Sequence, residues 1–198
     1  MKTIYSVTYQ VSGEEIKSLG LFNSINKVKD AIALHEVGGS FDAYSAVDLE
    51  KLTSNINYQL ATYYNDAERL FYSERDVEYR VHEWQFDDDF TIESDMLEVI
   101  HLEALDCDEI HESIGITPNR SYCSDIILGC EVSRRVSNGE DLSDEDKLNL
   151  VSEIDLVIAE NDKILFDEGD VCYCIVTHKF KNEKWITVKA KVRMLNDV

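Results

Sequence analysis

The chain has 198 residues and a net charge of −21, from 40 acidic and 19 basic side chains. This acidity disfavours direct binding to nucleic acid or to an anionic bilayer, because both carry negative charge. A hydrophobic share of 44%, with seven Phe and ten Tyr, is typical of a packed core and not of a disordered acidic tail. The length suits one domain or two small lobes.

The N-terminal sequence MKTIYSVTYQV has neither the apolar stretch nor the cleavage site of a signal peptide. No apolar run along the chain is long enough to span a membrane. Five cysteines, an odd number without regular spacing, indicate free thiols in a reducing compartment. We therefore expect a cytoplasmic protein.

The first third of the chain has the pattern of two strands followed by a helix. β-Branched and aromatic residues alternate over 3–11, and residues 16–22 continue as a second strand after a turn. Asn23 or Ser24 then caps a helix over 25–36, whose apolar positions recur at helical spacing.

The strongest helical pattern begins at Ser45 or Asp48 and continues to about residue 75, with apolar side chains three or four positions apart. Clean alternation over 77–86 predicts a third strand. The long helix is also rich in aromatic residues, which indicates deep burial or self-association through this helix. These aromatic residues are Tyr58, Tyr63, Tyr64, Phe71 and Tyr72.

The second half is predicted to be mainly helical before a final hairpin. Residues 92–105 fit a helix slightly better than a strand, and residues 122–136 fit a helix. Ser143, followed by three acidic residues, begins a further helix that runs to about residue 160. Two strands over 171–178 and 185–194 form the hairpin. No internal repeat is recognisable.

These elements predict an α+β protein with a small antiparallel sheet, a long helix, a helical segment and a C-terminal β-hairpin. We expect two lobes. The first covers residues 1–89 and contains the helix 45–75 as an insertion. The second covers residues 90–198 and is acidic and helical up to the hairpin.

The sequence around the first helix resembles a known group of domains. A strand ending in Gly-Leu-Phe-Asn-Ser at 20–24, a helix, and a strand ending in Val-His-Glu-Trp-Gln-Phe-Asp at 81–87 are similar to a family of small phage and bacterial αβ domains. The match covers about residues 3–36 and 77–88. These domains have no assigned activity, so the resemblance implies a phage or mobile-element setting and no chemistry.

Acidic residues concentrate between residues 77 and 112, where thirteen carboxylates accompany one base, Arg80. On a helix, carboxylates three or four positions apart lie on one face about 5–6 Å apart. Because a DNA strand advances about 3.4 Å per phosphate, such an array approximates the charge density of DNA. The predicted partner-binding residues are Asp87, Asp88, Asp89, Glu93, Asp95, Glu98, Glu103, Asp106, Asp108, Glu109 and Glu112. Asp141, Asp144, Glu145 and Asp146 extend this set.

In charge and size the chain resembles the DNA-mimic inhibitors of phages and plasmids. The resemblance implies a non-enzymatic inhibitor in the host cytoplasm, bound to a basic nucleic-acid-handling defence protein such as a CRISPR or restriction component. One alternative is a structural or accessory interaction module whose acidity only keeps it soluble. The other is an enzyme or a calcium-dependent protein.

Specific chemical sites have weaker support. Asp87, Asp89, Thr91, Glu93, Asp95 and Glu98 have the ligand spacing of an EF-hand loop. Ile92, however, stands where that loop requires Gly. Cys172 and Cys174 share one strand face, and His101, Cys107 and His111 lie close in sequence, but core packing explains them more simply than zinc. No hydrolase, nucleotide-binding or zinc-protease motif occurs, so we expect neither catalysis nor a cofactor.

Overall fold

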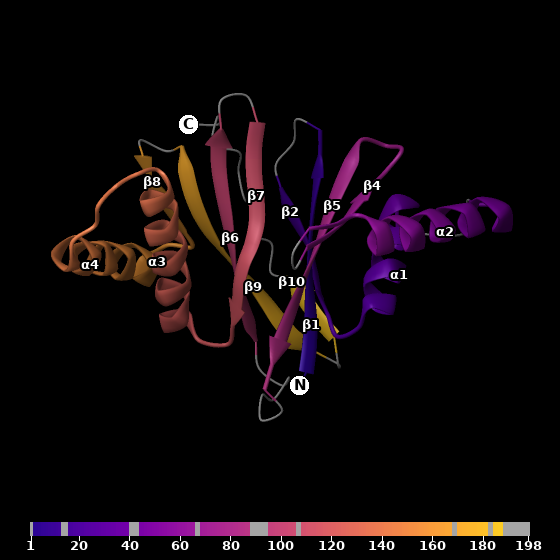
Figure 1. The fold of residues 1–198 in the computed structure, drawn as a ribbon. Helices are drawn as coiled ribbons and strands as arrows, with labels where there is room; N and C mark the ends of the chain where they lie inside the picture. Colours follow the sequence, from indigo (N-terminus) through magenta and orange to yellow (C-terminus); the bar gives the residue numbers. More distant parts are fainter. Residues whose placement is uncertain are drawn as a thin grey trace. The chain divides into compact units, whose positions relative to one another are not determined.

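A computed structural model describes residues 2–12, 16–39, 44–65, 68–87, 95–105, 108–167, 170–181 and 184–187. The fold is α+β, as predicted, and its strands form two antiparallel sheets (Figure 1). The chain divides into two compact units. The first unit contains β1–β5, α1, α2 and β10, and the second contains β6–β8, α3, α4 and all of β9 except its last residue.

The first unit is a five-stranded sheet, ordered β2-β1-β5-β4-β3, with two helices packed on it. Val7, Phe71 and Val81 from the sheet meet Ile32 and Ile56 from the helices in its core. The bounds are β1 (Lys2–Val11), β2 (Lys17–Phe22), α1 (Ile25–Glu36), α2 (Ala46–Thr62), β3 (Tyr64–Asn65), β4 (Glu68–Tyr72) and β5 (Val77–Phe86).

The second unit places two helices on a sheet in which β9 pairs with both β6 and β8, and β6 also pairs with β7. Cys123, Ile127 and Ile154 from the helices pack against Val99 and Tyr173 from the strands. The bounds are β6 (Met96–Leu105), β7 (Asp108–Thr117), α3 (Arg120–Ser137), α4 (Asp144–Glu160), β8 (Lys163–Phe166) and β9 (Val171–Lys181). Strand β10 (Lys184–Thr187) is next to β9 in the strand order, as the predicted hairpin requires, and residues 188–194 of the predicted second strand lie outside the described residues.

Side-chain caps define where the helices begin. Ser24 accepts a hydrogen bond from the backbone N–H of Lys27 at the start of α1, as the sequence predicts. Ser143 and Asp146 form a reciprocal capping box on α4, with three carboxylates in the first turn. The predictions for α1, α3 and α4 are therefore confirmed.

The predicted helix 45–75 is wrong beyond Thr62. Residues 64–65 and 68–72 are strands, and Phe71 pairs with Tyr79 of β5. The aromatic residues in this segment favour a strand, and pairing with β5 satisfies the backbone groups that a helix would otherwise satisfy internally. Self-association through one long helix accordingly loses its structural basis, although Tyr58 on α2 is 63% exposed.

The helix favoured over 92–105 is also wrong, because residues 96–105 form the central strand β6. Val99, Ile100 and Leu102 are buried, so apolar side chains occupy successive positions and hide the alternation typical of a strand. A short apolar run does not distinguish a doubly covered strand from a buried helix.

The two units repeat one architecture, although the sequence shows no recognisable repeat. Apart from the two-residue β3 and from β10, each is strand–strand–helix–helix–strand–strand, and the order β2-β1-β5-β4 corresponds to β7-β6-β9-β8. Val7 pairs with Gly20 just before a shift in register, and Val99 pairs with Gly115 just before the same shift. A β-bulge therefore occupies the same place in both hairpins.

The helices repeat as closely as the strands. Helices α2 and α4 each have 17 residues and a Ser N-cap. They bury Ile56 and Leu60 in one unit and Ile154 and Ile158 in the other at the same positions from the cap. Several of the matched positions carry identical residues, such as Ile56 and Ile154, but most of the residues between them differ, so sequence comparison within the chain does not reveal the repeat.

Candidate functional site

Residues 96–105, which fall in the part of the acidic segment where a helix was slightly favoured, form strand β6, and Asp108, Glu109 and Glu112 follow on β7. Successive side chains of a strand point to opposite faces, so Glu98 and Glu103, five positions apart on β6, do not share one face. Glu98 is fully buried, with its carboxylate 2.8 Å from Nε2 of His178, and it is therefore not available to a partner. The helix on which these carboxylates could have lined up is therefore not formed over residues 96–105.

The other predicted binding residues have different environments. Asp87 is exposed after β5, and Asp95 accepts a hydrogen bond from the backbone N–H of Phe180 at 3.1 Å. Glu103 is largely buried beside Arg134, at 3.7 Å, whereas the side chain of Glu112 is about half exposed. Asp108 and Glu109 lie on β7, and Asp88, Asp89, Glu93 and Asp106 fall outside the described residues.

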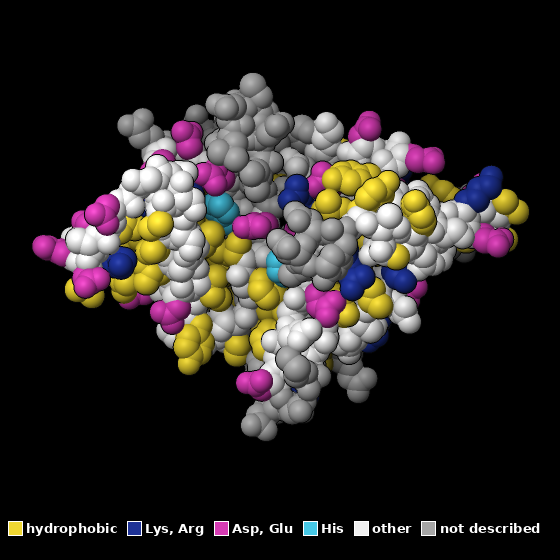
Figure 2. Space-filling model, in the orientation of Figure 1, with side chains coloured by type: hydrophobic (Ala, Val, Ile, Leu, Met, Phe, Trp, Pro, Cys, Tyr) yellow, Lys and Arg dark blue, Asp and Glu magenta, His cyan; other side chains and the backbone are white. Residues whose placement is uncertain are grey.

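The best-defined exposed acidic surface is the segment that leads into α4. Glu140, Asp141, Asp144, Glu145 and Asp146 are all exposed, and residues 140–146 contain no base. Figure 2 shows carboxylates gathered over the part of the second unit that carries α3 and α4. We call residues 140–146 the acidic segment of α4.

The proposed metal ligands do not form a metal site in the described part of the chain. Glu98 lies in the core, so it cannot complete a calcium loop that begins at Asp87. Cys172 and Cys174 are buried with their sulfur atoms 3.4 Å apart. His101 is buried with Glu103 and Glu112 each 3.8 Å from its ring. Among the described residues, no three His, Cys, Asp or Glu side chains converge as ligands would.

A carboxylate is buried at the same point of each unit. In the second unit Glu131 of α3 is fully buried and accepts hydrogen bonds from Arg134, Arg135 and the hydroxyl of Tyr173. Burial alone would raise the pKa of Glu131, but these hydrogen bonds outweigh it and lower the pKa. Glu131 is thus held ionised by groups of its own unit.

In the first unit the corresponding carboxylate is Glu36, the last residue of α1, which is only 6% exposed. The hydroxyls of Tyr79 and Ser73 each donate to one of its oxygen atoms, both at 2.5 Å. Arg75 donates to the backbone carbonyl of Glu36 and not to the carboxylate. No guanidinium among the described contacts therefore neutralises this carboxylate directly.

The hydroxyl of Tyr79 has a single hydrogen, which decides which group donates in each of its two hydrogen bonds. Tyr79 donates to Glu36, and Nδ1 of His35 lies 2.6 Å from the same hydroxyl oxygen, so His35 donates its Nδ1 proton to Tyr79. Burial lowers the pKa of His35, which favours the neutral ring. Burial and the hydrogen bond to Glu36 raise the pKa of Tyr79, so its hydroxyl keeps its proton.

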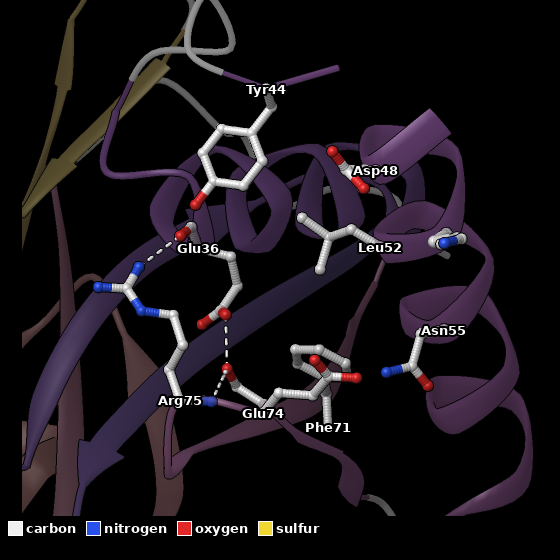
Figure 3. A pocket seen from close by; sticks show the side chains of 10 residues that line it. Glu36, Tyr44, Asp48, Leu52, Asn55, Phe71, Glu74 and Arg75 are labelled. Carbon is white, nitrogen blue, oxygen red and sulfur yellow. Dashed lines mark hydrogen bonds between the residues drawn. The ribbon is translucent and has the colours of Figure 1, made fainter. Parts of the chain in front are cut away.

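A pocket of about 690 Å³ opens beside Glu36, between α1, α2 and the turn after β4 (Figure 3). The volume is in the range of small-molecule sites. Carboxylates, bases and aromatic rings all contribute to its wall. The lining residues are Glu36, Tyr44, Asp48, Lys51, Leu52, Asn55, Phe71, Ser73, Glu74 and Arg75.

No pattern in the sequence predicts this pocket. Glu36 follows His35 at the end of an apolar helix face, and a carboxylate next to buried positions is the signal that could have marked it. The turn residues Ser73 and Arg75 were hidden inside the wrongly extended helix. Their approach to Glu36 depends on the pairing of β4 with β5.

No protein-family model, curated protein or solved structure matches the chain. Within the described ranges, every helix is too short or too polar to cross a bilayer.

Proposed function

We propose that the protein is a non-catalytic inhibitor, encoded by a phage or another mobile element, that binds a basic nucleic-acid-handling defence protein of the host. A CRISPR or restriction component is the partner class that this charge suits best. The acidic segment of α4 carries the proposal, because five carboxylates stand in seven residues and all are exposed. A surface of this kind attracts a groove that normally holds DNA.

The net charge of −21 supports the same partner class. Long-range attraction between opposite charges accelerates association and weakens steeply as salt increases. An accessory module that binds through apolar contacts would respond little to salt. Salt dependence therefore separates this proposal from an interaction module whose acidity is incidental.

The test is inhibition of DNA cleavage by purified restriction and CRISPR nucleases, measured at several KCl concentrations. Asp144→Lys with Glu145→Lys should weaken inhibition of the susceptible nuclease at least tenfold. Both side chains are exposed and neither is the capping residue Asp146, but both lie in the first turn of α4, so circular dichroism must show an intact helix before inhibition is compared. The matched control is Asp30→Lys with Glu50→Lys, which changes the charge equally on exposed helix positions of the first unit.

Equal loss of inhibition in both double variants would show that only net charge matters. Unchanged inhibition in the Asp144/Glu145 variant, or inhibition that is insensitive to salt, would reject the proposed binding surface. Failure to inhibit any nuclease, together with no competition against DNA, would reject the function.

A further inference from the structure

The repeated architecture allows the two buried carboxylates to be compared position by position. Along α1, the buried residues Val28 and Ile32 precede Glu36 at the same spacing with which Cys123 and Ile127 precede Glu131 along α3. Each carboxylate accepts a hydrogen bond from a tyrosine on the strand beside β1 or β6. These are Tyr79 on β5 and Tyr173 on β9.

The second unit fills the space beside its carboxylate with its own cations. Nε of Arg135 lies 2.6 Å from Glu131, and Arg134 contacts both carboxylate oxygens at 2.8 and 3.0 Å. The guanidinium of Arg135 also lies 5.7 Å from the ring centre of Phe166. A buried carboxylate and an aromatic ring together hold a guanidinium group in this unit.

The first unit lacks those cations because α1 is shorter than α3. Helix α1 ends at Glu36, whereas α3 continues past Glu131 to Ser137. By the same count along the chain, Gly39 corresponds to Arg134, and Ser40, the residue that corresponds in sequence to Arg135, lies outside the described residues. Neither residue type carries a charge, so the chain supplies no counterpart to the guanidinium groups at these positions.

A second difference widens the space. In the second unit, Phe166 of β8 pairs with Val171 of β9. In the first unit, the residue that corresponds to Val171 is Val77, and its carbonyl accepts a hydrogen bond from the N–H of Ser73. A serine thus takes the place of a phenylalanine. The missing arginines and the missing ring together explain why the first unit has a pocket beside its carboxylate.

We propose that the pocket of the first unit binds a guanidinium group supplied from outside the unit. An ionised carboxylate offers about four acceptor positions, and the two hydroxyls occupy one on each oxygen of Glu36. Phe71 and Tyr44 add aromatic surface, and Asp48 and Glu74 add negative charge around the opening (Figure 3). This inference goes beyond the proposed function and does not depend on it.

Two basic residues in the pocket wall, Lys51 and Arg75, allow the sign of the ligand's charge to be tested. Arg75 is directed to the backbone carbonyl of Glu36 at the end of α1, where a cation is favourable. Like Lys51, it repels a bound guanidinium. Removing Arg75 should therefore tighten binding of a cation, whereas it would abolish binding of an anion.

The experiment is an NMR titration of the full chain with N-acetyl-arginine amide, its neutral citrulline analogue and inorganic phosphate. We expect shifts at residues around the pocket with the arginine compound only. Glu36→Gln should weaken binding roughly tenfold to a hundredfold, since it removes charge-assisted hydrogen bonds. Glu145→Gln removes the same charge from an exposed position of the second unit and should leave binding unchanged.

Arg75→Gln should bind the arginine compound more tightly than the native chain. Ser73→Phe keeps the carboxylate but fills the pocket as Phe166 does, so it should abolish binding even if Glu36→Gln fails to fold. Equal binding of the citrulline analogue, or phosphate binding that Arg75→Gln removes, would overturn the proposal. So would the absence of any binding of the arginine compound.

The source of the guanidinium is tested by comparing free arginine with a blocked Ala-Arg-Ala peptide. Tighter binding of the peptide assigns the pocket to an arginine side chain of a protein. Tighter binding of free arginine assigns it to the amino acid, with Lys51 and Arg75 facing its carboxylate. Both results retain the guanidinium site, and neither depends on nuclease inhibition.

Discussion

Neutralising the two equivalent buried carboxylates should have unequal effects on stability. Glu131→Gln should lower the free energy of unfolding of the second unit by about 3 kcal/mol, near the lower end of the cost of breaking a buried ion pair. Glu36→Gln should lower that of the first unit by only about 1.5 kcal/mol, the lower end of the contribution of hydrogen bonds to a charged group.

The difference follows from the groups that each substitution leaves without a counter-charge. Loss of the Glu131 charge affects Arg134, whose side chain is 9% exposed, and Arg135, which is 25% exposed. Arg134 keeps Asp167 at 2.6 Å, which limits the loss. At Glu36 the donors are two hydroxyls, and the Ser73 hydroxyl can rotate to accept from the new amide.

Urea denaturation with hydrogen exchange measured separately on α1 and α3 would provide both free energies. Glu145→Gln is the control, because it removes an exposed carboxylate without a buried partner. Equal costs for the two substitutions, or no loss of protection in α3 of Glu131→Gln, would refute the view that the arginines depend on Glu131.

Three further predictions concern local features. Burial lowers the pKa of His35, so the unfolded chain binds a proton at a higher pH than the folded unit. The stability of the first unit should be complete above a pH of about 6.5 and fall as the pH decreases from there, and pH-dependent urea midpoints should show a flatter profile for His35→Gln. Gly129→Ala should raise the free energy of unfolding by roughly 1 kcal/mol, measured as a higher melting temperature, because Gly129 is helical and has open space around it. Gly115→Ala would place its Cβ 2.7 Å from Ile126 and should not raise the melting temperature. Ser143→Ala should lower the free energy of unfolding by about 1 kcal/mol, measured by urea denaturation followed by circular dichroism. A free energy of unfolding equal to that of the native chain would contradict the capping role.

Local signals predicted the elements that depend on local interactions. The cap at Ser24 and the acidic turn after Ser143 define their helices in the sequence and in the structure alike. Strand β4 depends on pairing with β5, and β6 depends on pairing with its hairpin partner β7 and with β9, which is distant in sequence, so helical spacing within these segments was misleading. Composition likewise cannot distinguish the buried Glu98 from an exposed carboxylate.

The candidate pocket was beyond prediction for a related reason. It is assembled from the end of α1, the exposed side of α2 and a turn, and each contributes residues that are ordinary in their own segment. The repeat was also not visible in the sequence, because the two units share helix caps, a β-bulge and buried positions. Different residue types can serve at such positions, as Val28 of the first unit and the equivalent Cys123 of the second unit do.

The unequal lengths of α1 and α3 show how little change can create a recess in an existing frame. Because α1 ends at its buried carboxylate, the first unit lacks both the charges of the two arginines and the volume that they fill in the second unit, whereas the sheet and helices are arranged alike in both units. If the halves descend from one ancestral module, they differ here in the length of one helix and in the exchange between Phe166 and Ser73, whereas the buried carboxylate and its tyrosine partner are common to both.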